Sequence, residues 1–249
     1  MSEEKYLKLL EKRWSIYSDV FGMKNFEKRM NRRISREGGK KILGELETIT
    51  PVLNKKILDA GSCCGEFLFE AVDKGAIGYG IEPDDLSLEI SELLFASKNK
   101  EVVLKKAGAE NIPFPNDSFD IVVSIFIIEH IKDYQTAILE MVRVLKPGGI
   151  LWLKSPNYLH YYERHYKRYY FPFLPKFIEQ KYFNLISGKK SNYFINLNRV
   201  TPGKLFRFLK KNNLKFSDLS KKDFKNKSLW RGILHGMGIY PQINLVIYK

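Results

Sequence analysis

Short apolar runs alternate with amphipathic segments along the chain after residue 55. Each apolar run has the length of a buried strand, and the segments between them repeat their apolar positions every three or four residues, as a helix does. The predicted strands cover residues 57–58, 78–81, 102–104, 119–128, 150–153, 214–219 and 243–248. Such alternation favours an α/β fold built on a mostly parallel sheet.

Several local signals predict where the helices between these strands begin and end. Gly75 is a typical helix stop, Asp84 can cap the helix that follows it, and Thr201 before Pro202 is a typical helix start. The run 146–149, Lys-Pro-Gly-Gly, is expected to end the helix that precedes the fifth strand.

Two regions lie outside the alternation. Residues 1–50 predict a helical N-terminal extension, with Leu7, Leu10 and Trp14 on one stripe and a break at Gly38-Gly39. Residues 51–249 form the predicted main domain. Within it, a segment of about 157–200 carries many Tyr and Phe residues between Lys and Arg residues, and we expect it to form an inserted lid that can act as an acceptor platform.

Charge is distributed unevenly over the 249 residues. The net charge is +14, yet residues 154–249 hold 20 Lys and Arg against 4 Asp and Glu, so the entire excess lies there. A basic surface of this kind favours an anionic partner, which can be nucleic acid, a phosphorylated small molecule or an acidic membrane surface. A well-solvated face without a partner explains the same composition.

The sequence excludes several classes of protein. No apolar run approaches the roughly 20 residues of a membrane-spanning helix, and no signal peptide follows Met1, so we expect a cytoplasmic location. The two cysteines, Cys63 and Cys64, are adjacent, which argues against a disulfide framework and a cysteine-rich zinc site. We expect no metal in the site.

The most informative segment is the turn after the first strand. Residues 57–65 read Ile-Leu-Asp-Ala-Gly-Ser-Cys-Cys-Gly, and Glu82 follows at the end of the next strand, 17 positions beyond Gly65. Glycines let a backbone pass close to a ligand, and an acidic residue at that distance can accept hydrogen bonds from ribose hydroxyls. The loop lacks the three-glycine spacing of dinucleotide-binding oxidoreductases, so this competing class is disfavoured.

Further motifs follow in order: Gly80-Ile81-Glu82, then Ala109-Glu110-Asn111-Ile112-Pro113-Phe114 with the residues up to Asp120, then Arg143-Val144-Leu145-Lys146-Pro147-Gly148-Gly149. With the first loop, they resemble the class I S-adenosylmethionine-dependent methyltransferases, particularly the type-11 group, over residues 55–157. The resemblance implies a Rossmann-like, doubly wound, mostly parallel seven-stranded sheet with helices on both faces. It also implies S-adenosylmethionine as cofactor.

By this resemblance, Asp59 lies near the methionine amino group, Glu82 holds the ribose hydroxyls and Ile125 lies on the sulfonium side. The remaining expected cofactor-binding residues are Gly61, Ser62, Cys63 and Gly65 in the loop, with Ala109 and Glu110 flanking the adenine. Two positions depart from the family pattern, because Cys63 and Gly108 stand where glycine and aspartate are common. Either the acceptor for the adenine amino group is lost at position 108, or Glu110 replaces it.

The expected reaction is in-line methyl transfer to a small-molecule, lipid or glycan-type acceptor. A general base helps when the acceptor is a hydroxyl, and His130 and His165 are the candidates. Two alternatives remain open. One is an RNA-directed methyltransferase that uses the basic C-terminal part, and the other is a non-catalytic S-adenosylmethionine-binding protein. Peripheral contact with a membrane also remains open.

Overall fold

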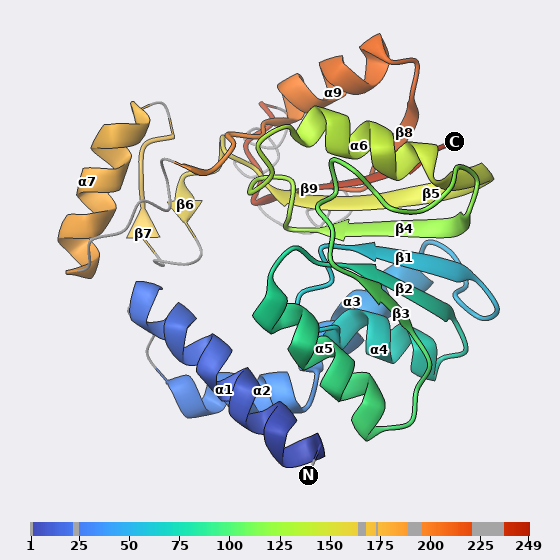
Figure 1. The fold of residues 1–249 in the computed structure, drawn as a ribbon. Helices are drawn as coiled ribbons and strands as arrows, with labels where there is room; N and C mark the ends of the chain where they lie inside the picture. The colour runs from blue at the N-terminus through green and yellow to red at the C-terminus, as the bar shows by residue number, and fades with distance from the viewer. Residues whose placement is uncertain (1, 22–24, 164–167, 173, 189–195, 221–236) are drawn as a thin grey trace.

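The computed structural model describes residues 2–21, 25–163, 168–172, 174–188, 196–220 and 237–249. Seven strands form one sheet in the order β3-β2-β1-β4-β5-β9-β8 (Figure 1). They are β1 (Lys56–Ala60), β2 (Ile77–Ile81), β3 (Val103–Lys105), β4 (Phe119–Ile125), β5 (Leu145–Pro156), β8 (Lys215–Asp218) and β9 (Gln242–Tyr248). β9 runs antiparallel to both of its neighbours, β5 and β8, and the remaining strand pairs described in this sheet are parallel. The predicted Rossmann-like fold is confirmed.

Helices cover both faces of the sheet. They are α4 (Glu66–Asp73), α5 (Asp85–Ser97), α6 (Tyr134–Arg143) and α9 (Pro202–Lys211). In Figure 1, α6 and α9 lie above the sheet, and α4 and α5 lie below it. Successive strand residues point to opposite faces, so Leu58 and Val122 join the core under α6 and α9, whereas Ile57 and Val123 join the core against α4.

The local helix signals at Gly75, Asp84 and Thr201 are confirmed. The side chain of Asp84 accepts a hydrogen bond from the Ser87 N–H at 2.9 Å and caps α5. Thr201 caps α9 in the same way, with Pro202 as the first helical residue. Gly75 follows the end of α4 with φ of +87°, a conformation that favours glycine.

The N-terminal extension consists of α1 (Ser2–Phe21), α2 (Phe26–Ile34) and α3 (Glu37–Glu47). The predicted break at Gly38-Gly39 is wrong, because α3 runs through both glycines and the chain turns instead at Arg36, with φ of +53°. A Cβ atom on Gly39 would lie 2.4 Å from the carbonyl oxygen of Glu66. The glycine therefore allows α3 to pack closely against the start of α4.

Two ion pairs fix the extension on α4. Arg33 contacts Glu66 at 3.0 Å and Arg36 contacts Glu70 at 2.6 Å, and both carboxylates are buried. The guanidinium of Arg36 also lies over the ring of Phe69. These pairs join two segments about thirty residues apart in the sequence. The extension is therefore packed against the sheet domain.

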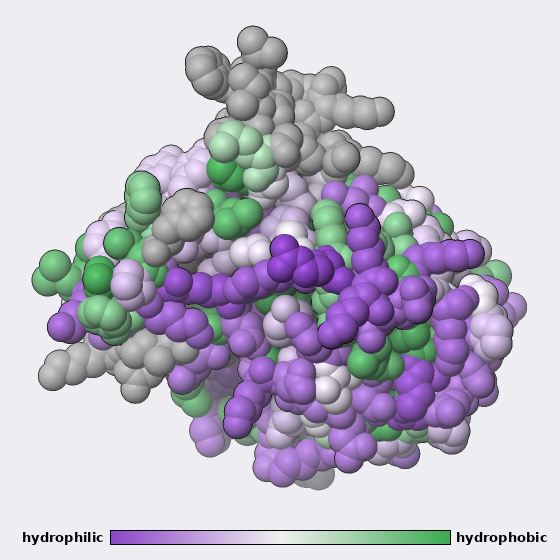
Figure 2. Space-filling model, turned by 90° about the horizontal axis from the view of Figure 1, so that it is seen from above, coloured by the Kyte–Doolittle hydropathy of each residue, from purple (hydrophilic) through white to green (hydrophobic). Residues whose placement is uncertain are grey.

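The predicted lid region contains a two-stranded sheet, β6 (Tyr162–Glu163) with β7 (Arg168–Tyr169), followed by α7 (Lys176–Ser187). Several large apolar side chains are exposed here, with Leu185 at 83% and Tyr169 at 68%. Figure 2 shows hydrophobic residues protruding among hydrophilic ones on the left, the side on which Figure 1 places α7. No helix among the described residues is both long and apolar enough to span a membrane.

Two strands, β4 and β5, have an end three or more residues away from its predicted bound. β4 ends at Ile125 rather than at residue 128, because Phe126 takes a positive φ of +58° and turns the chain. β5 begins at Leu145, well before the predicted position 150, and the run 146–149 forms an irregularity inside the strand rather than the end of α6. These shifts leave the predicted order of elements unchanged.

Candidate functional site

The turn between β1 and α4 lies at the carboxyl ends of the parallel strands. Gly61 and Gly65 have φ of +85° and +77°, a region that favours glycine. The N–H groups of Gly61 and Ser62 both donate to the carbonyl of Ile81, at 2.9 and 3.0 Å, and tie the turn to β2. Cys63 also has a positive φ, +49°, so this loop keeps a glycine-like conformation where the thiol replaces the glycine.

Glu82 lies at the end of β2 beside this loop. One carboxylate oxygen accepts the N–H of Cys63 at 2.9 Å, and the other accepts the N–H of Asp84 at 3.0 Å. Burial raises the pKa of Glu82. A carboxylate oxygen has two lone pairs, so each retains capacity for a ligand hydroxyl. Glu82 therefore orders the loop and also presents acceptors, a structural role that sequence reasoning missed.

A cavity of about 330 Å³ opens between this loop and the N-terminal extension. It collects the expected residues Asp59, Gly61, Ser62, Cys63 and Ile125. The remaining lining residues are Trp14, Arg33, Gly38, Gly39, Ile42, Cys64, Glu66, Phe67 and Phe126. The contribution of the extension was not predicted, because nothing in its local sequence shows which surface it covers.

The other expected residues lie outside the lining of this cavity, namely Gly65, Glu82, Ala109 and Glu110. A larger depression, of about 880 Å³, follows β2, β3 and α5 but contains none of the expected site residues. The smaller cavity matters more for function because it lies at the carboxyl ends of the strands, where open α/β sheets bind their ligands.

The cavity holds acidic groups with strongly perturbed pKa values. Burial raises the pKa of Asp59 to about 8, and the nearby Cys63 and Glu82 raise it further. The Sγ atoms of Cys63 and Cys64 lie 3.9 Å apart, and this thiol hydrogen bond lowers the pKa of Cys63 to about 7. Asp59 is therefore held neutral near pH 7 by its surroundings. A positively charged ligand group would favour its ionised form.

Ser62 is among the residues that line the cavity, but its hydroxyl is buried and has no hydrogen-bond partner within the described part of the chain. A Cβ atom on Gly80 would lie 3.0 Å from this hydroxyl oxygen and 3.2 Å from a methyl carbon of Leu68. The hydroxyl therefore faces the apolar core around Leu68 and Leu104 rather than the cavity.

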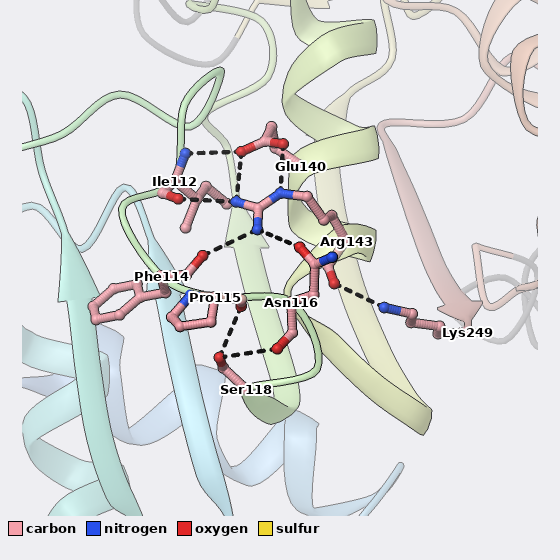
Figure 3. Close-up of polar contacts among 8 residues, drawn as sticks. All are labelled: Ile112, Phe114, Pro115, Asn116, Ser118, Glu140, Arg143 and Lys249. Atoms are coloured by element: carbon pink, nitrogen blue, oxygen red, sulfur yellow. Dashed lines mark hydrogen bonds and ion pairs between the residues drawn. The ribbon is translucent and has the colours of Figure 1, made fainter.

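Arg143 organises the loop that follows β3 (Figure 3). Its guanidinium donates to the carbonyl oxygens of Ile112 and Phe114 at 2.9 and 3.0 Å, and to the side chain of Asn116 at 2.8 Å. It also forms two hydrogen bonds with Glu140, which in turn accepts the N–H of Ile112. The arginine of the fourth motif therefore shapes the loop that carries the expected adenine contacts.

Within that loop, Ala109 is buried and Glu110 is half-buried. A Cβ atom on Gly108 would lie 3.0 Å from Oε2 of Glu110. The Glu110 carboxylate thus reaches the space beside position 108, where the family commonly has aspartate. This placement agrees with Glu110 as the replacement acceptor.

The two candidate bases differ in what the structure says of them. His130 follows β4, its side chain is 45% exposed, and its Nε2 lies 3.9 Å from a carboxylate oxygen of Glu129. Glu129 is itself buried, and burial raises its pKa to about 8. His165 lies outside the described residues. His130 therefore stays a candidate, with a buried carboxyl group behind it that the sequence did not single out.

Gly61 is closely packed against Ile127. A Cβ atom there would lie 2.5 Å from Cγ2 of Ile127, and the positive φ adds backbone strain. A bulky residue at this position would disturb folding as well as binding.

Comparison with known proteins gives a consistent family. The profile of the family described as "Methyltransferase domain" matches residues 58–153. A demethylmenaquinone methyltransferase of Geobacillus sp. (strain WCH70) is 34% identical over 129 residues, which cover 48% of this chain and 53% of that protein. A ubiquinone biosynthesis O-methyltransferase of Bartonella tribocorum is 27% identical, with 44% of each chain covered. The chain spans about half the length of the curated relatives it matches.

Solved structures show the same fold. The YcgJ protein of Bacillus subtilis superposes with a TM-score of 0.58 at 18% identity, covering 83% of this chain and 97% of that one. An S-adenosylmethionine-dependent methyltransferase of Mesorhizobium loti superposes with a TM-score of 0.57 at 14% identity, covering 83% and 96%. At these identities the similarity establishes the fold alone.

Proposed function

We propose that this protein methylates a small-molecule acceptor, because residues 58–153 belong to the class I S-adenosylmethionine-dependent methyltransferases. The observation that carries the proposal is the cavity at the carboxyl ends of the strands, where Asp59, the 61–65 loop and Ile125 meet. Glu82 lies directly beside it, hydrogen-bonded to the loop.

The residues present fit S-adenosylmethionine. The Glu82 carboxylate retains acceptor capacity for ribose hydroxyls, and Asp59 gains stability as an anion when a cationic group approaches. We assign Asp59 to the amino end of the cofactor and Glu82 to its ribose. The loop residues Gly61, Ser62, Cys63 and Gly65 would lie along the cofactor, Ala109 and Glu110 would flank its adenine, and Ile125 would lie near its sulfonium.

When bound, the cofactor supplies an activated methyl group. The protein's contribution is to position the acceptor and exclude water, which can be worth up to ~7–11 kcal/mol when alignment is good. The apolar side chains of Trp14, Ile42, Ile125 and Phe126 line the cavity and would exclude water from it once the cofactor is bound. For a hydroxyl acceptor, His130 would take the proton, which contributes about 10²–10⁴-fold in rate. Its neighbour Glu129, whose pKa burial raises to about 8, would stabilise the protonated imidazole in its ionised form, which the imidazolium charge would favour.

For the acceptor, we infer an amphipathic small molecule with an apolar body. The exposed side chains of Tyr169, Phe171, Phe177 and Leu185 give the lid region an apolar surface, which suits such a ligand. The curated relatives are named for quinone methylation, and quinones and their precursors are of this type. The lid lies outside the matched residues 58–153, and we assign the choice of acceptor to its surface.

The test is transfer of a labelled methyl group from S-adenosylmethionine to fractions of a cell extract. Label in the organic-soluble fraction would support the proposal. Label in RNA would instead favour the RNA-directed enzyme, and its loss at high salt would agree with the basic C-terminal part as the RNA-binding surface. Saturable cofactor binding without label in any fraction would point to a binding protein.

A further inference from the structure

A second, smaller cavity adjoins the cofactor cavity. Its volume is about 190 Å³, and it is lined by Trp14, Arg29, Arg32, Arg33 and Gly38. Three of these residues, Trp14, Arg33 and Gly38, also line the cofactor cavity. The two cavities therefore meet at these residues, and a group that enters the small cavity lies next to the proposed methionine end of the cofactor.

The three guanidinium groups differ in their acidic partners. Arg33 is paired with the buried Glu66 at 3.0 Å, and its guanidinium lies 3.8 Å from the ring centre of Trp14. Arg32 forms an exposed pair with Glu37 at 2.7 Å. Arg29 is half-buried, and the described residues offer it no carboxylate within ion-pair distance. The cavity thus contains three positive groups, of which one has no acidic counterpart.

The chemistry of these groups selects the ligand. A guanidinium presents N–H donors in a planar fork that matches the two oxygens of a carboxylate or phosphate. The Trp14 ring holds Arg33 in place, and the ion pair with Glu66 fixes its orientation. An oxyanion placed here would accept charge-assisted hydrogen bonds from Arg29. Binding would cost little conformational entropy at Arg33, because that side chain is already held in place.

We propose that Arg29, together with Arg32 and Arg33, forms an oxyanion-binding subsite next to the cofactor cavity. This assignment rests on the proposed function, which places S-adenosylmethionine in the neighbouring cavity. The oxyanion can come from two sources: the methionine carboxylate of the cofactor, or a carboxylate or phosphate group on the acceptor. Both share the chemistry that the arginine cluster recognises, and experiment separates them.

The test compares Arg29→Gln with Lys28→Gln, which makes the same charge change at the exposed neighbouring position on α2. Calorimetry measures three ligands on each protein: S-adenosylhomocysteine, 5′-methylthioadenosine, which lacks the carboxylate, and inorganic phosphate. Loss of a charge-assisted hydrogen-bonded pair should weaken the affected ligand by about tenfold or more. The variant Arg29→Lys keeps the charge but loses the fork, and should recover only part of the affinity.

If Arg29→Gln weakens S-adenosylhomocysteine alone, the oxyanion is the cofactor's carboxylate. If it weakens phosphate alone, the oxyanion belongs to the acceptor. If all three ligands bind Arg29→Gln as they bind Lys28→Gln, the proposal is wrong. A wild-type protein that binds phosphate through Arg29 but neither adenosyl compound would contradict the proposed function and leave the subsite standing.

Discussion

Replacing Arg143 with Met should loosen the loop that carries the proposed adenine contacts. The substitution keeps much of the side chain's length but removes three hydrogen bonds, those to Ile112, Phe114 and Asn116, along with the pair to Glu140. A hydrogen bond from a charged donor contributes ~1.5–3 kcal/mol when buried. Because the Arg143 side chain is 31% exposed, we take about 1 kcal/mol for each, or ~3 kcal/mol in total.

The assay is thermal unfolding together with calorimetry of S-adenosylhomocysteine. For a chain of this size the loss corresponds to a fall in Tm of ~6–12 °C, and cofactor-product affinity should fall because the loop is no longer ordered. The matched control is Lys5→Met, which removes an exposed ion pair with Glu89 away from both cavities and should cost less than ~1 kcal/mol. Equal losses of stability in the two variants would refute the reasoning.

Three other perturbations test separate parts of the structure. The pKa of Asp59 is about 8 in the folded state, so between pH 4 and 8 the folded state holds a proton on Asp59 that the unfolded state has lost. The free energy of unfolding of the wild type should therefore fall by ~2 kcal/mol more than that of Asp59→Asn between pH 6 and 8. Parallel pH profiles of the two Tm values would contradict this prediction. Arg36→Met leaves the buried Glu70 carboxylate unpaired, so urea unfolding should show a free energy of unfolding lower by ~3 kcal/mol. An unchanged unfolding midpoint would contradict the role of this ion pair in holding the extension on α4. Asp84→Ala removes the cap of α5 and should cost ~1 kcal/mol by the same measurement, with Asp84→Asn as the conservative variant that retains most of it.

The sequence predicted the sheet well because its information there is local. A buried parallel strand is a short apolar run, and a helix end carries its own cap, as Asp84 and Thr201 do. The glycine-rich turn and Glu82 were identified for the same reason. Their spacing along the chain is set by the length of one strand–helix–strand unit.

The features that the sequence did not predict depend on contacts between segments that are distant along the chain. Gly38 and Gly39 looked like a helix break, but Gly39 lies inside α3 because the backbone of Glu66 approaches it. Arg33 looked like one charge among many, and its pairing with Glu66 became visible only in the folded chain. The sequence also did not predict that Trp14 and other residues of the extension line the cavity, because these contacts join segments that are distant in the sequence.

The central claim is that the cavity beside Glu82 binds S-adenosylmethionine, and the most direct test is calorimetric titration of the intact protein with S-adenosylhomocysteine. The account predicts saturable binding at one site per chain, with affinity at least tenfold weaker in Glu82→Gln, because the amide accepts fewer hydrogen bonds than the carboxylate. Thermal unfolding of both proteins establishes that each is folded. A flat titration with folded wild-type protein would contradict the claim.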